Sequence, residues 1–167
     1  DGLLVGRELS GATVGLIGMT APARPLAALL GAFGSKVLGY DPALHPSDIT
    51  WRLHDIEHCT LRDLFVECDG VCLLLAYYTR YRGLIGSRYL ESCKENQVLV
   101  SVEHSSLIDE RALAMALTDG RMAGAWLDSL EPGTLDASRP LAQVHTLQVT
   151  PRVAGTTRES RLRSAWM

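Results

Sequence analysis

The amino-acid sequence predicts a doubly wound α/β fold with a mostly parallel sheet, and three observations favour it. Apolar, β-rich runs alternate with helix-like segments along most of the chain. Several of these runs are apolar at nearly every position, which is typical of parallel strands buried on both faces. The stretch 15–42, GLIGMTAPARPLAALLGAFGSKVLGYDP, has the layout of a nucleotide-binding strand, turn, helix, strand and acid.

The predicted elements follow one another in a regular order. Strands are expected at 13–17, 36–39, 71–75, 98–102, 123–127 and 147–150. Helix-like segments at 22–33, 61–68, 87–94 and 109–117 separate most of them. Asp109 and Glu110 favour a helix start, where the dipole attracts negative charge, and Asp119-Gly120 favours its end. The segment 45–60 is the least regular, and 131–140 is expected to be a loop that contains proline and glycine.

Length and composition indicate a single domain of ordinary size. The chain has 167 residues, of which 47% are hydrophobic and 21% charged, and its net charge is −3. This charge balance gives no reason to expect nucleic acid or a membrane surface as partner. No apolar run approaches the roughly 20 residues of a membrane span and no signal peptide begins the chain, so a cytoplasmic location is expected. The four cysteines are expected to be free thiols; they are Cys59, Cys68, Cys72 and Cys93.

The turn after the first strand departs from the usual nucleotide-binding glycine pattern. In that pattern the first glycine permits a tight turn, the second lets the backbone approach the pyrophosphate, and the third allows close helix packing. Gly18 keeps the first place and Ala23 serves in the third, but Thr20 brings a branched Cβ to the second. Pro22 has no N–H for an anion, so one phosphate donor is missing. Thr20 is predicted to cap a helix whose first turn includes Pro22.

Asp41 ends the second predicted strand, about 20 residues beyond the glycine turn. A carboxylate there accepts hydrogen bonds from an adenosine ribose and repels a 2′-phosphate, which favours NAD over NADP. Alternatively, Asp41 is only a polar strand exit. The turn that begins at Gly18 and the carboxylate of Asp41 together predict a dinucleotide-binding domain with NAD as its cofactor. The predicted cofactor-binding residues of this unit are Gly18, Thr20, Ala21, Ala23 and Asp41.

Several spaced blocks make nearly the whole chain resemble one known family. The blocks are GRELSG at 6–11, AFGSKVLGYDP at 32–42, RGLIG at 82–86, LIDERALAMAL at 107–117, GRMAGAWLDSLEP at 120–132 and VTPRVAGTTRES at 149–160. They resemble the NAD-binding domain of the D-isomer-specific 2-hydroxyacid dehydrogenases. The resemblance implies a Rossmann-type fold, NAD as cofactor, a small 2-oxo or 2-hydroxy acid as substrate and a homodimer. Residues 1–167 are expected to form this single domain, and the family's separate substrate domain is absent from this chain.

The family's chemistry implies an arginine that binds the substrate carboxylate, a histidine that acts as general acid and base, and a glutamate that orients the histidine. His104 stands at the place of the arginine, and Arg152 stands at the place of the histidine. Arginine does not exchange protons near neutral pH. Glu131 is the best match to the glutamate, in a loop that is two residues shorter than the family's. Asp128 matches the aspartate that contacts the nicotinamide carboxamide.

These departures leave three hypotheses about function. The first is a catalytically degraded NAD-binding-type domain that acts as a nucleotide-binding or interaction module. The second is an NAD-dependent oxidoreductase of a 2-hydroxy or 2-oxo acid, in which His104 supplies the proton, Arg152 binds the carboxylate and Glu131 has an altered role. The third is a structural domain with no ligand, which follows if Thr20 and Pro22 abolish pyrophosphate binding.

Other polar and aromatic clusters have simpler interpretations. His54 and His58 have a spacing that suits zinc on a helix, but without a second ligand pair they are interpreted as a solvated segment, and no metal site is predicted. Arg80 and Arg82 are interpreted as solvated. Three tyrosines after the strand at 71–75 either line an adenine pocket or cover the sheet edge; they are Tyr77, Tyr78 and Tyr81.

Overall fold

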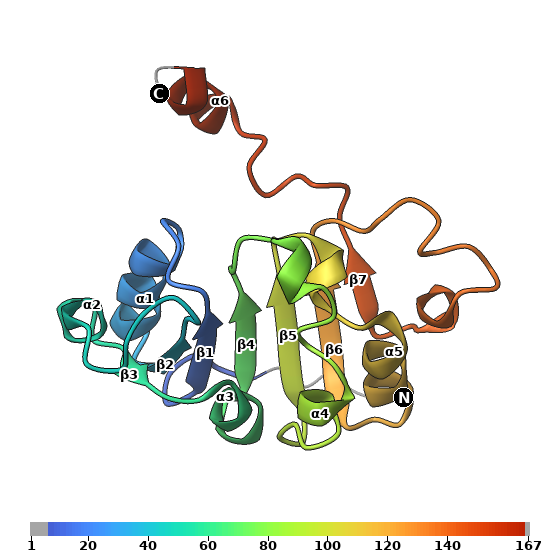
Figure 1. Ribbon diagram of the computed structural model, residues 1–167, viewed down its shortest axis with the longest axis horizontal. Coiled ribbons are helices and arrows are strands. Elements are labelled where there is room, and N and C mark those ends of the chain that lie inside the picture. The colour runs from blue at the N-terminus through green and yellow to red at the C-terminus, as the bar shows by residue number, and fades with distance from the viewer. Residues whose placement is uncertain (1–6, 166–167) are drawn as a thin grey trace.

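The computed structural model describes residues 7–165 and confirms the doubly wound α/β fold (Figure 1). All neighbouring strands pair in parallel, in the order β3-β2-β1-β4-β5-β6-β7. The strands are β1 (Thr13–Ile17), β2 (Lys36–Tyr40), β3 (Glu57–His58), β4 (Gly70–Leu73), β5 (Gln97–Ser101), β6 (Met122–Leu127) and β7 (Leu147–Val149). The strand order reverses between β1 and β4, and folds of this kind bind ligands at the carboxyl ends of the strands there.

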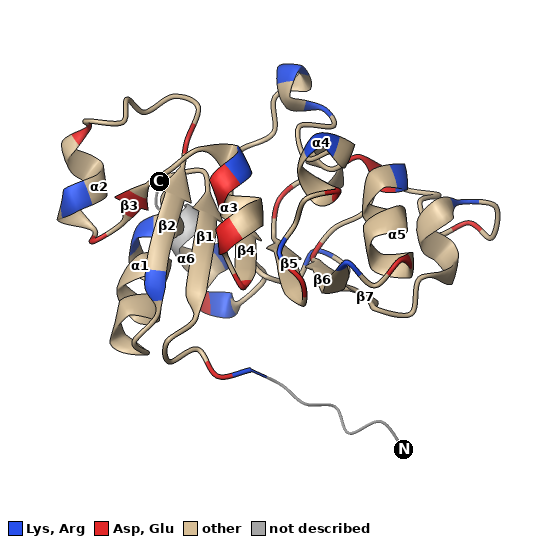
Figure 2. Cartoon of the chain, turned by 90° about the horizontal axis from the view of Figure 1, so that it is seen from below, with Lys and Arg blue, Asp and Glu red and all other residues tan. Residues whose placement is uncertain are grey.

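The helices lie on both faces of the sheet. They are α1 (Ala23–Ala32), α2 (Ile49–Leu53), α3 (Leu61–Glu67), α4 (Ser87–Leu90), α5 (Glu110–Thr118) and α6 (Arg158–Ala165), with 3₁₀ turns η1 (Thr79–Tyr81), η2 (Ser105–Leu107) and η3 (Pro140–Gln143). Helices α3, α4 and α5 cover one face and α1 covers β1 and β2 on the other, whereas α6 lies apart, beyond the carboxyl edge (Figures 1 and 2).

The hydrophobic core is divided between the two faces. The larger cluster lies beneath α3, α4 and α5 and includes Phe65 and Leu113, and a smaller cluster beneath α1 includes Leu16 and Trp51. Within the described residues, no helix covers the second face of β5 and β6. Val100 is therefore 37% exposed and Trp126 50% exposed. The expectation of burial on both faces is wrong for these two strands, because an apolar sequence does not say whether a helix covers each face.

The ends of α5 lie close to where the sequence places them. Asp109 caps its first turn, because the carboxylate accepts a hydrogen bond of 2.8 Å from the Ala112 N–H. Gly120 follows the helix with a φ of +71°, a conformation that glycine adopts readily. Both predictions are confirmed.

The segment 45–60 contains two elements that its sequence did not reveal. Asp48 caps the short helix α2 by accepting a hydrogen bond of 2.8 Å from the Thr50 N–H, and Trp51 in this helix is only 3% exposed. His58 packs edge-on against the Trp51 ring, with 5.1 Å between ring centroids. The segment therefore supplies the buried indole that closes the core beneath α1.

The four cysteines form no disulfide. All four cysteines are free thiols, and burial raises the pKa of Cys59 and of Cys68 to about 12, so neither is a thiolate at neutral pH.

Figure 2 shows charged residues of both signs on the helices and loops around the sheet. Across residues 7–165, no helix combines the length and apolarity needed to cross a membrane.

Candidate functional site

The turn between β1 and α1 packs directly against the strand at the switch point. Gly18 has a φ of +96°, and a Cβ added there would lie 2.6 Å from the backbone N and Cα of Leu75. The Gly18 N–H also donates to the Tyr40 carbonyl at 2.8 Å. The close approach of two backbones therefore requires glycine at this position.

Asp41 is tied to the same turn. One of its carboxylate oxygens accepts a hydrogen bond of 2.7 Å from the Met19 N–H, and the other accepts one of 2.7 Å from the Ala43 N–H. Each carboxylate oxygen can accept a second hydrogen bond, so these contacts leave capacity for a ribose hydroxyl. They also fix the carboxylate at the carboxyl end of β2, beside the turn.

The predicted capping role of Thr20 is wrong. Its hydroxyl donates to the Leu74 carbonyl at 2.9 Å, and α1 begins at Ala23 with Pro22 in the cap position and no side-chain cap. The threonine turns toward β4 because a buried strand-end carbonyl there needs a donor. Pro22 therefore precedes the first helical turn instead of lying within it.

The turn retains features that fit a dinucleotide. In the described chain, the N–H groups of Thr20 and Ala21 make no hydrogen bond, and α1 begins two residues later at Ala23. Free N–H groups before a helix favour a phosphate, and Asp41 lies at the ribose position. These residues would hold the pyrophosphate and the adenosine ribose of NAD. Because Pro22 has no N–H, the turn offers one donor fewer than the usual pattern.

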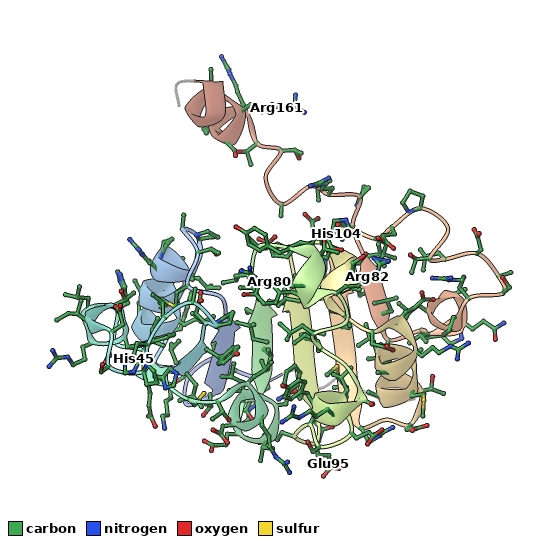
Figure 3. The ribbon with its side chains drawn as sticks, in the orientation of Figure 1. His45, Arg80, Arg82, Glu95, His104 and Arg161 are labelled. Atoms are coloured by element: carbon green, nitrogen blue, oxygen red, sulfur yellow. The ribbon has the colours of Figure 1, made fainter. Side chains whose placement is uncertain are left out.

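The three predicted catalytic residues come together. His104, Glu131 and Arg152 line one open cavity of about 240 Å³ at the carboxyl ends of the strands. His104 follows β5, Glu131 follows β6 and Arg152 follows β7, so neighbouring parallel strands bring all three to the same edge. Figure 3 shows His104 and Arg82 at this edge, far from His45 and Glu95.

The His104 ring is held from two sides. Its Nδ1 atom accepts a hydrogen bond of 3.2 Å from the Ser106 N–H, which places the proton of the neutral ring on Nε2. Tyr77 stacks on the ring with 4.5 Å between centroids and an interplanar angle of 17°. In this arrangement His104 caps the short turn η2 and presents an Nε2–H donor.

Glu131 is bound to the same turn and not to His104. Its Oε1 accepts a hydrogen bond of 2.6 Å from the Ser106 hydroxyl, and the Arg82 guanidinium lies 3.7 Å from Oε2. The Ser106 hydrogen bond, with the charges of Arg82, His104 and Arg139, holds the pKa of Glu131 below its usual value, although burial opposes this. Glu131 therefore stays ionised near neutral pH.

Asp128 anchors the chain that carries Arg152. The carboxylate accepts hydrogen bonds from the Thr150 hydroxyl at 2.5 Å, the Val153 N–H at 2.9 Å and the Ala154 N–H at 2.8 Å. Burial alone would raise the pKa of Asp128, but these bonds and the Arg152 charge lower it overall. Arg152 itself has a φ of +57° and is exposed. Contact between Asp128 and a nicotinamide carboxamide stays a prediction.

Ser106 and Arg82 are functional neighbours that sequence reasoning did not identify. Ser106 joins His104 and Glu131, and its hydroxyl accepts a hydrogen bond of 3.1 Å from Arg82. The interpretation of Arg82 as solvated is therefore incomplete, because its side chain is 59% exposed but also contacts Ser106 and Glu131. The only signal was the position of Arg82 at the head of the RGLIG block, which gives no partner.

The tyrosines after β4 separate into two groups. Tyr77 contacts His104, whereas Tyr78 and Tyr81 meet edge-on with Arg80 over both rings, 5.1 Å and 4.8 Å from their centroids. Arg80 is therefore engaged in cation–π contacts and its interpretation as simply solvated is incomplete. Tyr77 and Tyr81 also pack against the core, which favours covering of the sheet edge.

Comparison with known proteins gives the family. The model of the D-isomer-specific 2-hydroxyacid dehydrogenase NAD-binding domain matches residues 2–154. The chain belongs to this NAD-binding domain family. The resemblance drawn from the sequence blocks is therefore confirmed, and NAD is the cofactor that the family supports for this domain.

Curated relatives of this NAD-binding domain carry the names of dehydrogenases and reductases. (S)-sulfolactate dehydrogenase of Chromohalobacter salexigens is 35% identical over 165 residues, which cover 98% of this chain and 53% of the relative. Glyoxylate reductase of Aeropyrum pernix is 33% identical over 99% of this chain and 49% of the relative. The chain spans about half the length of the curated relatives it matches.

Solved structures show the same fold. A D-isomer-specific 2-hydroxyacid dehydrogenase of Lactobacillus delbrueckii, described as an NAD-complexed form, has a TM-score of 0.80 and 28% identity over 94% of this chain and 51% of its own. Glyoxylate reductase from Paecilomyes thermophila has a TM-score of 0.83 and 25% identity over 97% of this chain and 48% of its own. The Rossmann-type architecture of the domain is thus shared with these two solved structures.

Proposed function

We propose that this domain binds NAD but has lost the proton transfer of its family, and that it acts as a nucleotide-binding or interaction module. NAD, when bound, exchanges a hydride, and the protein must exchange the matching proton. The observation that carries the proposal is the state of the three residues at the catalytic positions. His104 accepts the Ser106 N–H at Nδ1, which the doubly protonated ring that a general acid needs could not do. Glu131 is held ionised by Ser106, and Arg152 keeps its proton near neutral pH.

A second candidate is an NAD-dependent oxidoreductase with exchanged roles. It is favoured by the single cavity that His104, Glu131 and Arg152 line. In this candidate Arg152 binds the carboxylate of a small 2-oxo or 2-hydroxy acid. His104 releases the Ser106 N–H, is protonated on both ring nitrogens and donates the Nε2 proton to the reacting oxygen. The names of two relatives, sulfolactate dehydrogenase and glyoxylate reductase, indicate the class of acid. A structural domain without a ligand is the third candidate.

Hydride transfer separates the first two candidates. The natural protein that carries this domain is assayed at its full length. It is mixed with NADH and a panel of 2-oxo acids that includes glyoxylate, and the loss of NADH absorbance is followed. We expect wild type to oxidise NADH no faster than the mixture without protein does. The rate of NADH oxidation should be the same with His104→Ala. Oxidation that falls about 100-fold or more in His104→Ala would establish the oxidoreductase, because general acid catalysis contributes about that much.

Changing Pro22→Ile is expected to tighten NADH binding at least about tenfold. The change restores an N–H beside the free amides of Thr20 and Ala21, and a hydrogen bond to a charged group contributes about 1.5–3 kcal/mol. Calorimetric titration of NADH measures the change, and Pro46→Ala, in the exposed loop that follows β2, is the control. Equal affinity in wild type and Pro22→Ile would show that the missing donor does not limit binding.

We further propose that the domain forms a homodimer in the cytoplasm. The exposed apolar strip on β5 and β6, which includes Val100 and Trp126, supports self-association because soluble monomers rarely expose such faces. The four free thiols support a reducing compartment. Sedimentation equilibrium would contradict the dimer by returning the mass of one chain at every concentration.

A further inference from the structure

Tyr77 and His104 form a rigid pair of stacked rings, here called the Tyr77–His104 stack. The rings lie nearly parallel, 4.5 Å apart at their centroids, and both side chains are half-buried. The Ser106 N–H holds the His104 ring through Nδ1, and Tyr77 packs against the core. Neither ring is therefore a freely rotating surface side chain.

The stack stands between the cofactor turn and the catalytic cavity. On one side, Tyr77 follows Leu75 by two residues, and Leu75 is the residue whose backbone meets Gly18. On the other side, His104 lines the cavity that also contains Glu131 and Arg152. The stack therefore bridges the carboxyl ends of β4 and β5, where Figure 3 shows His104.

The sheet order gives the direction in which a dinucleotide must run. Asp41 marks the ribose of the adenosine half at the end of β2, and the strands that follow across the sheet are β1, β4 and β5. A dinucleotide that starts at Asp41 and crosses the Gly18 turn reaches β4 and β5 with its other half. That half carries the nicotinamide ring.

We propose that the Tyr77–His104 stack is the wall against which the nicotinamide half of NAD packs, so that it gives the domain a preference for the whole dinucleotide over ADP-ribose. The inference rests on the proposed NAD binding. A flat aromatic ring gains offset stacking on such a wall beyond simple burial. Tyr78, the next residue, is 56% exposed and engaged with Arg80, so it does not contribute to this wall.

The test compares the dissociation constants of NAD⁺ and ADP-ribose, measured by calorimetry with this chain and its variants. We expect wild type to bind NAD⁺ roughly tenfold more tightly than ADP-ribose. Tyr77→Leu is expected to abolish that preference while ADP-ribose affinity stays within about twofold. Tyr77→Phe keeps the stacking ring and is expected to keep the preference, as is the control Tyr78→Leu.

The outcomes separate this inference from the proposed function. ADP-ribose binding by Tyr77→Leu shows that the variant is folded and that its turn is intact. If the preference survives in Tyr77→Leu, or if wild type has none, the stack is not the nicotinamide wall, while NAD binding stands. If wild type binds neither compound, the proposed NAD binding fails and this inference fails with it.

Discussion

Replacing Gly18→Ala is expected to lower the free energy of unfolding by about 3 kcal/mol, as measured by urea denaturation. The φ of +96° is unfavourable for alanine, and its Cβ would lie 2.6 Å from the Leu75 backbone, which cannot rotate away as a side chain can. Relief requires separation of β1 from β4, whose pairing reaches Ile17 and Leu73 at this end. The cofactor turn should therefore be lost together with stability.

Gly31→Ala is the matched control for this change. Gly31 lies within α1, and a Cβ added there meets nothing within 4 Å. Alanine is a better helix former than glycine, so this variant is expected to gain about 0.5–1 kcal/mol. A Gly18→Ala protein as stable as wild type would show that the two backbones are not in contact.

Asp128→Ala is expected to lower the free energy of unfolding by about 3 kcal/mol. The side chain is 5% exposed, and its removal leaves the N–H groups of Val153 and Ala154 without an acceptor. Hydrogen exchange of these two amides should become much faster than in wild type. Asp119→Ala, which removes an exposed ion pair with Arg121, should change stability by less than about 0.5 kcal/mol. Unchanged exchange in Asp128→Ala would contradict the anchoring role.

The carboxylate of Asp128 is expected to make the stability of the protein depend on pH. The pKa of Asp128 is lower in the folded protein than in the unfolded chain, so the unfolded state binds the proton first. The stabilisation is complete above the unfolded pKa of about 3.9 and is lost as pH falls through the lower folded pKa. The stability difference between wild type and Asp128→Asn should therefore shrink below about pH 4. A stability difference between the two proteins that stays constant below about pH 4 would contradict a lowered pKa of Asp128.

The sequence predicted the fold well where elements are long and periodic. The buried runs that became β1, β2 and β4 and the capped helix α5 are examples, because burial and capping each leave a local pattern. The helix α2 and the strand β3 were missed. The helix has five residues and the strand two, which is too few to show a periodic pattern. The stability of this segment comes from the burial of Trp51 by distant parts of the chain.

The candidate site was predictable only in part. The family blocks located His104 and Arg152 at exchanged positions, and parallel strands bring both to one cavity. What those residues do depends on Ser106, because its contact with Glu131 joins residues 25 apart in sequence. Such a side-chain contact has no periodic signature. For the same reason the turn of Thr20 toward the Leu74 carbonyl could not be anticipated.

We expect the turn from Gly18 to Ala23 to bind a dinucleotide although Thr20 and Pro22 alter it. Calorimetric titration of the chain with NADH, and separately with NADPH, tests this most directly. We expect saturable binding of NADH at one site, with weaker binding of NADPH because Asp41 repels the 2′-phosphate. Absence of saturable heat at millimolar NADH would contradict it.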